Sequence, residues 1–421
     1  MEVLLFAGAG TSIELGVPGM FGMAEEFLDH SRQWQVELAL VQRIMGESLD
    51  IENLIEALDR ICTARSSLEA IGQDIVSLDR VDKIRAEVEW FVQHAAERVV
   101  TNDARLMWGS VLRAASSLDL TLVTTNYDRA IELAANAEQV LIDDGFGPFD
   151  EGETASWIGF SQAGDRFPLV KLHGSTDWYA AGKLASPLKL RHPMPLFGRA
   201  VLHLANGQDL GSALVLPSRE KLLTHDPYPR LSQTFLNAAD HCDVAIFVGS
   251  SLRDYHIRGA AQTTACRVPV FVVNPAGETY GIERVRPIKQ FASTFLIATL
   301  PNALLAPTPI AALESIVAQS SDNGGLLPAV REALDADAPA DRRCRALEQL
   351  DDMEATLDPF LLRQLLTDSD SRVARYSLGL ISLSAARDAL IEAASTTTHA
   401  EEPAFREDLQ LLRNMVPKGT M

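Results

Sequence analysis

The stretch Val3-Leu4-Leu5-Phe6-Ala7-Gly8-Ala9-Gly10-Thr11-Ser12 decides the fold, because an uninterrupted apolar run leads directly into a glycine turn. Similar apolar runs, rich in β-branched residues, recur at residues 3–7, 120–124, 168–172, 213–216, 244–248 and 268–273. Most of them end in Gly, Asn, Asp or Ser, with stretches long enough for helices between them. This pattern predicts an α/β fold with a Rossmann-like, doubly wound parallel sheet.

Two helical regions are predicted outside this sheet. Residues 24–118 read as a large helical insertion, which either covers one edge of the sheet or serves as a lid or partner surface. Three prolines within residues 301–309 predict the end of a first domain (1–300), a linker (301–312) and an α-helical C-terminal domain (313–421). Around residues 360–378 the pattern fits one HEAT-like helix-turn-helix unit, so a plain helical domain and a repeat array remain the alternatives.

Composition limits the function. The chain carries 37 Lys and Arg against 57 Asp and Glu, a formal net charge of -20, which disfavours direct nucleic-acid binding through a basic surface. It lacks both a cationic leader at its start and an apolar run long enough to span a bilayer, so we expect a cytoplasmic protein without membrane association. The four cysteines, Cys62, Cys242, Cys266 and Cys344, form no CxxC pair, which predicts no zinc site and a reducing compartment.

The glycine turn after the first strand suits a phosphate-bearing ligand, since glycines let the backbone approach a pyrophosphate. Tight structural packing is the alternative reason for these glycines. The full GxGxxG fingerprint is absent, because Ile13 occupies its third glycine position. Further polar clusters follow the other strands, at Asn126 to Asp128, His173 to Asp177, Gly249 to Asp254 and Asn274. Because an open parallel sheet binds its ligands at the carboxyl ends of its strands, we expect these clusters to meet in one crevice.

In this order the motifs resemble those of sirtuins. The matching segments are Gly8-Ala9-Gly10-Thr11-Ser12 with Gly16-Val17-Pro18, Thr125-Asn126-Tyr127-Asp128, His173-Gly174, Gly249-Ser250-Ser251 and Val273-Asn274. The forms KLHGSTDW (171–178) and GSSLRDYH (249–256) look like the divergent bacterial branch of sirtuin-like NAD hydrolases used in antiphage defence. The resemblance covers about residues 1 to 300 and has no counterpart in the tail.

The resemblance implies NAD as the consumed cofactor and assigns residue roles. It places His173 as the base near the nicotinamide ribose, Asn126 as the group that orders that ribose and its water, and Asp128 at the nicotinamide carboxamide. Ser250, Ser251 and Asn274 would hold the adenosine ribose and phosphates. Asp254 would bond a ribose hydroxyl or favour the dipole of a helix start. The remaining expected binding residues are Gly8, Ala9, Gly10, Thr11, Ser12, Pro18 and Gly249.

Two departures from deacetylating sirtuins favour hydrolysis. The paired zinc cysteines are missing, and Gly22 follows Phe21 where those enzymes have an arginine. We therefore expect water to accept the ribosyl group, yielding nicotinamide and ADP-ribose. The alternatives are a catalytically weak NAD or ADP-ribose binding module, a zinc-independent deacylase, and an ADP-ribosyl cyclase or transferase. By resemblance the enzyme would be a homo-oligomer that depletes NAD in antiphage defence, gated by assembly, by a HerA-type ATPase or by a phage-derived activator.

Overall fold

The computed structural model describes residues 1–45, 50–63, 78–115, 118–151, 153–161, 166–181, 185–193, 202–203, 209–215, 226–317, 325–381, 384 and 386–414. Its centre is a seven-stranded sheet in the order β12-β11-β10-β1-β2-β5-β3, with every pair parallel. The strands are β1 (Glu2–Ala7), β2 (Asp119–Thr124), β3 (Ile142–Asp143), β5 (Phe167–Lys171), β10 (Val244–Val248), β11 (Val270–Asn274) and β12 (Val285–Lys289). This order confirms the predicted doubly wound fold, in which β1 is the central strand where the winding reverses.

The sheet is buried on both faces, which explains why its strands read as continuous apolar runs. Val3 and Leu5 of β1 belong to one hydrophobic cluster, whereas Leu4 and Phe6 belong to the cluster on the opposite face. The first face packs against α7 (Thr101–Ala114), α8 (Ala130–Ala137), the π-helical turn η3 (Phe295–Thr299) and α12 (Leu300–Leu305). The second packs against α9 (Tyr228–His241) and α10 (Tyr255–Ala265). Side chains that alternate along each strand thus build two cores.

One predicted strand of the parallel sheet is wrong. Residues 213–215 form no strand, and Leu216 lies outside the described residues. The residues just before them, 209–212, belong instead to a five-stranded antiparallel sheet in the order β4-β7-β6-β9-β8, which the apolar runs did not predict. Its strands are β4 (Thr154–Ser156), β6 (Trp178–Ala180), β7 (Leu188–Leu190), β8 (Leu202–His203) and β9 (Asp209–Ser212). They are two to four residues long, too short for an alternation pattern to identify them.

The structure divides the predicted insertion of residues 24–118 into two parts. Its first part is a helical subdomain with its own hydrophobic core, to which Phe27, Leu54 and Val88 contribute. Its helices are α2 (Met20–His30), η1 (Arg32–Trp34), α3 (Gln35–Met45), α4 (Ile51–Thr63) and α6 (Leu78–Ala96). The second part, α7, carries Trp108 and Val111 into the core that covers the parallel sheet. Helical periodicity alone cannot show which core a helix joins.

The predicted linker of residues 301–312 is helical except for a bend at residues 306–308. Pro301 lies in the first turn of α12, and Pro309 begins α13 (Pro309–Val317). Proline is accommodated in the first helical turn, where its missing N–H would have had no intrahelical partner. Two of the three prolines therefore stand at helix starts, and Pro307 lies in the short bend between α12 and α13. Just before them, α11 (Ala292–Thr294) opens this helical stretch.

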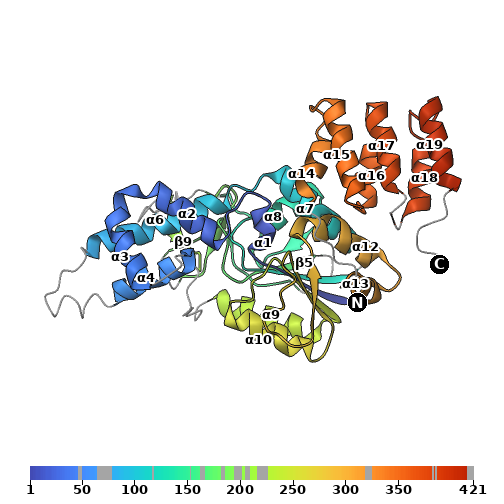
Figure 1. The fold of residues 1–421 in the computed structure, drawn as a ribbon. Helices are drawn as coiled ribbons and strands as arrows, with labels where there is room; N and C mark the ends of the chain where they lie inside the picture. Colours follow the sequence, from blue (N-terminus) through green and yellow to red (C-terminus); the bar gives the residue numbers. More distant parts are fainter. Residues whose placement is uncertain are drawn as a thin grey trace.

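The tail consists of three helix pairs stacked side by side, which we call the helical array (Figure 1). The pairs are α14 (Leu327–Leu334) with α15 (Ala340–Asp352), α16 (Pro359–Leu366) with α17 (Ser371–Ile381), and α18 (Arg387–Ser395) with α19 (Pro403–Asn414). The array and the helical subdomain lie at opposite ends of the α/β domain (Figure 1). In the described part of the chain, no helix has the length and apolar character needed to cross a membrane.

The array shares a core with the α/β domain. Leu327 and Val330 of α14 belong to the same hydrophobic cluster as Trp108 of α7. Arg113 of α7 also bonds Asp358 at the start of α16, with an Nη2 to Oδ2 distance of 2.6 Å, and its guanidinium lies 4.3 Å from the centroid of the Phe360 ring. The first helix pairs are therefore a continuation of the α/β core and not a separately tethered unit.

Candidate functional site

Two glycine turns lie against each other at the carboxyl ends of β1 and β10. Gly8 N–H donates to the Val248 carbonyl and Gly10 N–H to the Gly249 carbonyl, each at 2.8 Å. A Cβ on Gly10 would lie 2.7 Å from Gly249 Cα, and one on Gly249 would lie 2.6 Å from Thr11 N. Both distances are too short for any side chain, so the packing of the turns by itself requires glycine at these positions.

This packing leaves a small set of backbone donors unused. The N–H groups of Ala9, Ser250 and Ser251 have no acceptor among the described residues, and all three residues line one cavity. The helix that follows the first turn, α1 (Gly10–Ile13), has only four residues. Individual N–H groups, more than a long helix dipole, are therefore what this turn offers to an anion.

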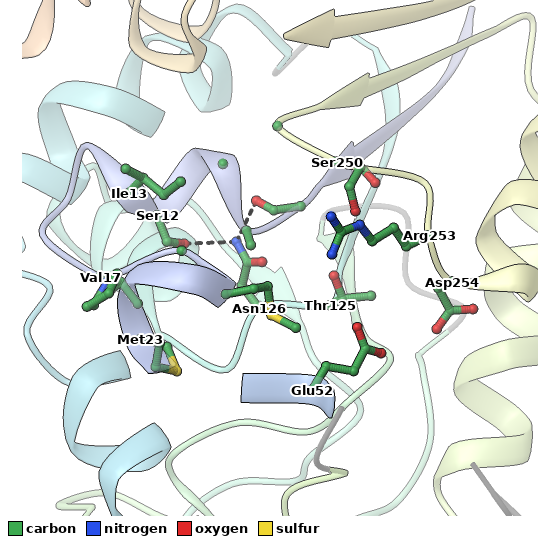
Figure 2. Close-up of a pocket in the computed structure, with 18 of the residues that line it drawn as sticks. Ser12, Ile13, Val17, Met23, Glu52, Thr125, Asn126, Ser250, Arg253 and Asp254 are labelled. Atoms are coloured by element: carbon green, nitrogen blue, oxygen red, sulfur yellow. Dashed lines mark hydrogen bonds between the residues drawn. The ribbon is translucent and has the colours of Figure 1, made fainter. Parts of the chain in front are cut away.

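A chain of hydrogen bonds joins the turn after β2 to the first glycine turn. Asn126 Nδ2 lies 2.9 Å from Ser12 Oγ and 3.0 Å from both Thr11 Oγ1 and the Gly8 carbonyl (Figure 2). Ser12 Oγ in turn donates to Asp128 Oδ2 at 2.6 Å. The amide nitrogen of Asn126 is thereby fixed on the protein side, and its carbonyl Oδ1 is the polar atom left for the cavity.

His173 follows β5 and faces the carboxylate of Asp254, the residue that precedes α10. Its Nε2 lies 3.6 Å from Asp254 Oδ2, and its side chain is only 11% exposed. Asp254 Oδ1 meanwhile accepts the N–H of His256 at 3.0 Å and so caps α10. Because the helix cap fixes the carboxylate, Asp254 presents its second oxygen to the imidazole in a defined place. Asp254 thus favours the helix start, as one of its two predicted roles required, and also faces His173.

The predicted site residues converge, with one exception. All but Thr11 line a cavity of about 650 Å³, a volume within the usual range for small-molecule sites. Thr11 is buried behind it, where its hydroxyl donates to Gly8 O. The members of the predicted set that line the cavity are Gly8, Ala9, Gly10, Ser12, Pro18, Asn126, Asp128, His173, Gly249, Ser250, Ser251, Asp254 and Asn274.

Two predicted binding residues also have structural partners. Asn274 exchanges hydrogen bonds with the backbone of Glu278, both at 2.9 Å, so its side chain shapes the loop after β11. Asp128 receives Ser12 Oγ on one oxygen and the Ala130 N–H, at the start of α8, on the other. Their contacts to a nucleotide remain predictions.

The cavity also has walls that sequence reasoning missed. The helical subdomain contributes Ile51 and Glu52 from α4 and Val92 from α6, and the loop after β10 contributes Arg253. Glu52 and Arg253 both reach the space around Thr125 and Asn126 (Figure 2). Arg253 lies inside the GSSLRDYH segment and could have been selected as a cation near a strand end. No local pattern distinguishes Glu52 from other residues at a helix start.

Buried ion pairs support the site from below. Lys171, whose side chain is 1% exposed, donates to the Asp128 carbonyl at 2.5 Å and to Glu132 at 2.8 Å. Asp177 lies 3.6 Å from Lys189, and although burial opposes its ionisation, Lys189 and Lys171 keep the pKa of Asp177 below its usual range. The charged residues of the KLHGSTDW segment on either side of His173 therefore anchor the loop that carries it.

Fold and cavity together define a doubly wound α/β protein with a crevice at its strand ends. Residues 120–266 match the family model of a SIR2-like domain, which confirms the predicted resemblance at that level. In the described residues, no group of three or more His, Cys, Asp or Glu side chains is arranged to hold a metal ion. No curated protein sequence matches the chain.

Several solved Sir2 structures are similar to the chain. A Sir2 homologue in complex with NAD is 14% identical with a TM-score of 0.43, over 75% of this chain and 90% of that one. A mutant Sir2 homologue with ADP-ribose is 14% identical with a TM-score of 0.41, over 74% and 93%. A structure described under the mechanism and regulation of Sir2 enzymes is 16% identical with a TM-score of 0.37, over 75% and 93%.

Replacing Lys171 should test the buried support. Lys171→Met leaves Glu132 buried without its cation, so we expect a loss of about 3–5 kcal/mol in the free energy of unfolding. Glu132→Leu in the same chain should restore much of that loss. The measurement is urea denaturation, with Lys83→Met on the exposed face of α6 as the control. A Lys171→Met protein as stable as the control would contradict the assignment.

Glu97, which follows α6, should make stability depend on pH. Burial raises the pKa of Glu97 to about 7 against an opposing attraction from Arg129. The folded state therefore keeps a proton on Glu97 up to a higher pH than the unfolded state does. The stability that this proton contributes is complete at low pH and is lost as the pH rises through about 7. Glu97→Gln should match the wild type at pH 4 and exceed it at pH 8 by on the order of 1 kcal/mol, once partial exposure is discounted. Denaturation curves at both pH values test this, with the exposed Glu25→Gln as the control. If the stability difference between Glu97→Gln and the wild type is the same at pH 4 and pH 8, the prediction is wrong.

Proposed function

We propose that the protein hydrolyses NAD to nicotinamide and ADP-ribose. One observation carries the proposal: the bonds of Asn126 to Gly8, Thr11 and Ser12 direct its carbonyl oxygen to the cavity that also holds the His173 and Asp254 pair. An anchored acceptor, a histidine and unused backbone donors in one crevice fit a ligand that combines ribose hydroxyls with phosphates. The SIR2-like match over residues 120–266 supports NAD as that ligand.

Binding would divide between the two sides of the crevice. The unused N–H groups of Ala9, Ser250 and Ser251 would bond the pyrophosphate oxygens. Asn126 and His173 would face the nicotinamide ribose on the other side. This arrangement would place the glycosidic bond beside the two residues and away from the phosphate donors.

The chemistry requires a base and charge stabilisation, and no strong acid. When the bond from ribose C1 to the nicotinamide nitrogen breaks, its electron pair neutralises the pyridinium and nicotinamide leaves as a neutral molecule. The ribose then carries oxocarbenium-like charge, as in glycoside hydrolysis. Asn126 Oδ1 would orient the attacking water, whose oxygen bonds to C1 and whose proton passes to His173 and then to solvent. Asp254, 3.6 Å from Nε2, would stabilise the imidazolium formed in that step.

Substituting the two central residues tests the reaction. His173→Ala and Asn126→Ala should each lower nicotinamide release by about 100-fold or more, the usual contribution of a positioned base or orienting group. Chromatography of nicotinamide after incubation with NAD measures this, and thermal melting confirms folding. His241→Ala and Asn237→Ala on exposed parts of α9 are the matched controls.

The assay also separates the alternatives. Binding of NAD with no nicotinamide release, in every oligomeric state and with every activator tried, would leave a binding module and end the hydrolase proposal. A cyclic or acyl-carrying product in place of ADP-ribose would identify the acceptor as something other than water. Full activity in either variant would remove that residue from the mechanism.

We further propose that activity is gated through the helical array, since unregulated hydrolysis of NAD would harm the cell that makes it. Glu14 directly follows the residues of α1 and accepts the Ser293 N–H at 2.9 Å and also the Ser293 hydroxyl. Ser293 Oγ accepts the Leu326 N–H, at the start of α14, at 3.0 Å. The first glycine turn is thus two side chains away from the array. On the basis of the resemblance, we also propose a biological role in defence against phage. A partner ATPase or a phage-derived molecule would then be the trigger.

Gating by assembly predicts that activity follows oligomeric state. Specific activity should rise with protein concentration together with the mass measured by light scattering. Ser293→Ala, which removes the bridging hydroxyl, should change how steeply activity responds to assembly while leaving the oligomer itself intact. A persistent monomer with full activity at every concentration would refute this form of gating.

A further inference from the structure

Arg253 has an unusual place in the cavity wall. It lies in the loop between β10 and α10, two residues after Ser251. Among the described lysines and arginines, it is the one that lines the cavity. Its guanidinium points across the crevice toward Thr125 and Asn126, on the same side as Ser250 (Figure 2).

Residues of the helical subdomain hold this guanidinium loosely. Its Nη1 lies 3.4 Å from Asp50 Oδ2, and its Cζ lies 5.5 Å from the centroid of the Phe21 ring. Asp50 is 7% exposed and also uses Oδ1, at 2.7 Å, to accept the Asn53 N–H in the first turn of α4. Of the five N–H donors of Arg253, one therefore meets an acceptor among the described residues.

An anionic ligand in this cavity would need a cationic partner, because its surroundings are acidic. The molecule carries a formal charge of -20, and Asp128, Asp254 and Glu52 are acidic residues of the cavity wall. The backbone donors of Ala9, Ser250 and Ser251 can bond phosphate oxygens but carry no net charge. A guanidinium supplies both charge and a planar pair of donors that matches two phosphate oxygens.

We propose that Arg253 is the residue that recognises the diphosphate group of the nucleotide, with Asp50 and Phe21 holding its guanidinium over the crevice. The inference rests on the proposed nucleotide site and identifies the residue that recognises the charge of the ligand there. It also gives the helical subdomain a part in binding, since Phe21 and Asp50 come from its helices α2 and the start of α4. The ligand chemistry is a nucleoside diphosphate, of which ADP-ribose is the probe.

Calorimetric titration with two ligands tests the proposal without turnover. ADP-ribose carries the diphosphate and adenosine lacks it. Arg253→Met should weaken ADP-ribose binding roughly 10- to 100-fold, the loss expected for a charge-assisted hydrogen bond, and leave adenosine binding within about 2-fold. Arg253→Lys should recover part of the affinity, because it restores charge without the planar donor pair. Raising the salt concentration should weaken ADP-ribose binding less in Arg253→Met than in the wild type.

Arg258→Met is the matched control, since Arg258 lies one turn along α10 and lines a different surface hollow. It should bind ADP-ribose as the wild type does. Equal affinity of wild type and Arg253→Met for ADP-ribose overturns the inference and leaves the hydrolase proposal standing. Equal losses for ADP-ribose and adenosine also overturn it, because they indicate a damaged site and not a lost charge contact. A wild-type protein that binds no ADP-ribose overturns both proposals.

Discussion

The close approach of two turns, Gly8 to Gly10 and Gly249, is the constraint on which the rest of the structure depends. Their backbones touch where β1 and β10 end side by side, and no Cβ fits between them. Because these strands flank the point where the winding of the sheet reverses, the contact sets the floor of the crevice. It also determines which backbone donors remain for a ligand. The N–H groups of Gly8, Gly10 and Gly249 already donate to the carbonyls of Val248, Gly249 and Val273.

The side chains above this floor are fixed by hydrogen bonds to it. Asn126 reaches the first turn directly, and Asp128 reaches it through Ser12. Lys171 holds the Asp128 carbonyl from below and belongs to the same segment as His173. The residues proposed for chemistry are therefore held by buried polar contacts, which is the arrangement that catalysis by preorganised groups requires.

The sequence predicted the parts of the fold that follow from local pattern. Five of the six apolar runs are strands of the parallel sheet. A strand that is buried on both faces is apolar at nearly every position, so the sequence alone identifies it. The short strands β4, β6, β7, β8 and β9 lack such a signal. Prolines at 301 and 309 were read as a break although they stand at helix starts. Helical periodicity grouped α7 with the other helices of the predicted insertion, although α7 packs in a different hydrophobic core from theirs. Most of the site could be predicted because topology brings strand ends together, whereas Glu52 enters from a separate helical core that no strand pattern positions.

The excess of acidic residues in the chain bears on how the cavity could bind an anionic ligand. A protein with a formal charge of -20 repels a dianionic ligand at long range, although salt screens this over about 8 Å at physiological ionic strength. Inside a cavity the screening is weaker, so contacts at a few ångströms decide binding. There the wall combines uncharged backbone donors with the guanidinium of Arg253, which is more than half exposed and tied to one carboxylate at 3.4 Å. A cation held this loosely could turn to phosphate oxygens at little cost, and its contact with Asp50, just before α4, makes the helical subdomain part of the same cavity wall.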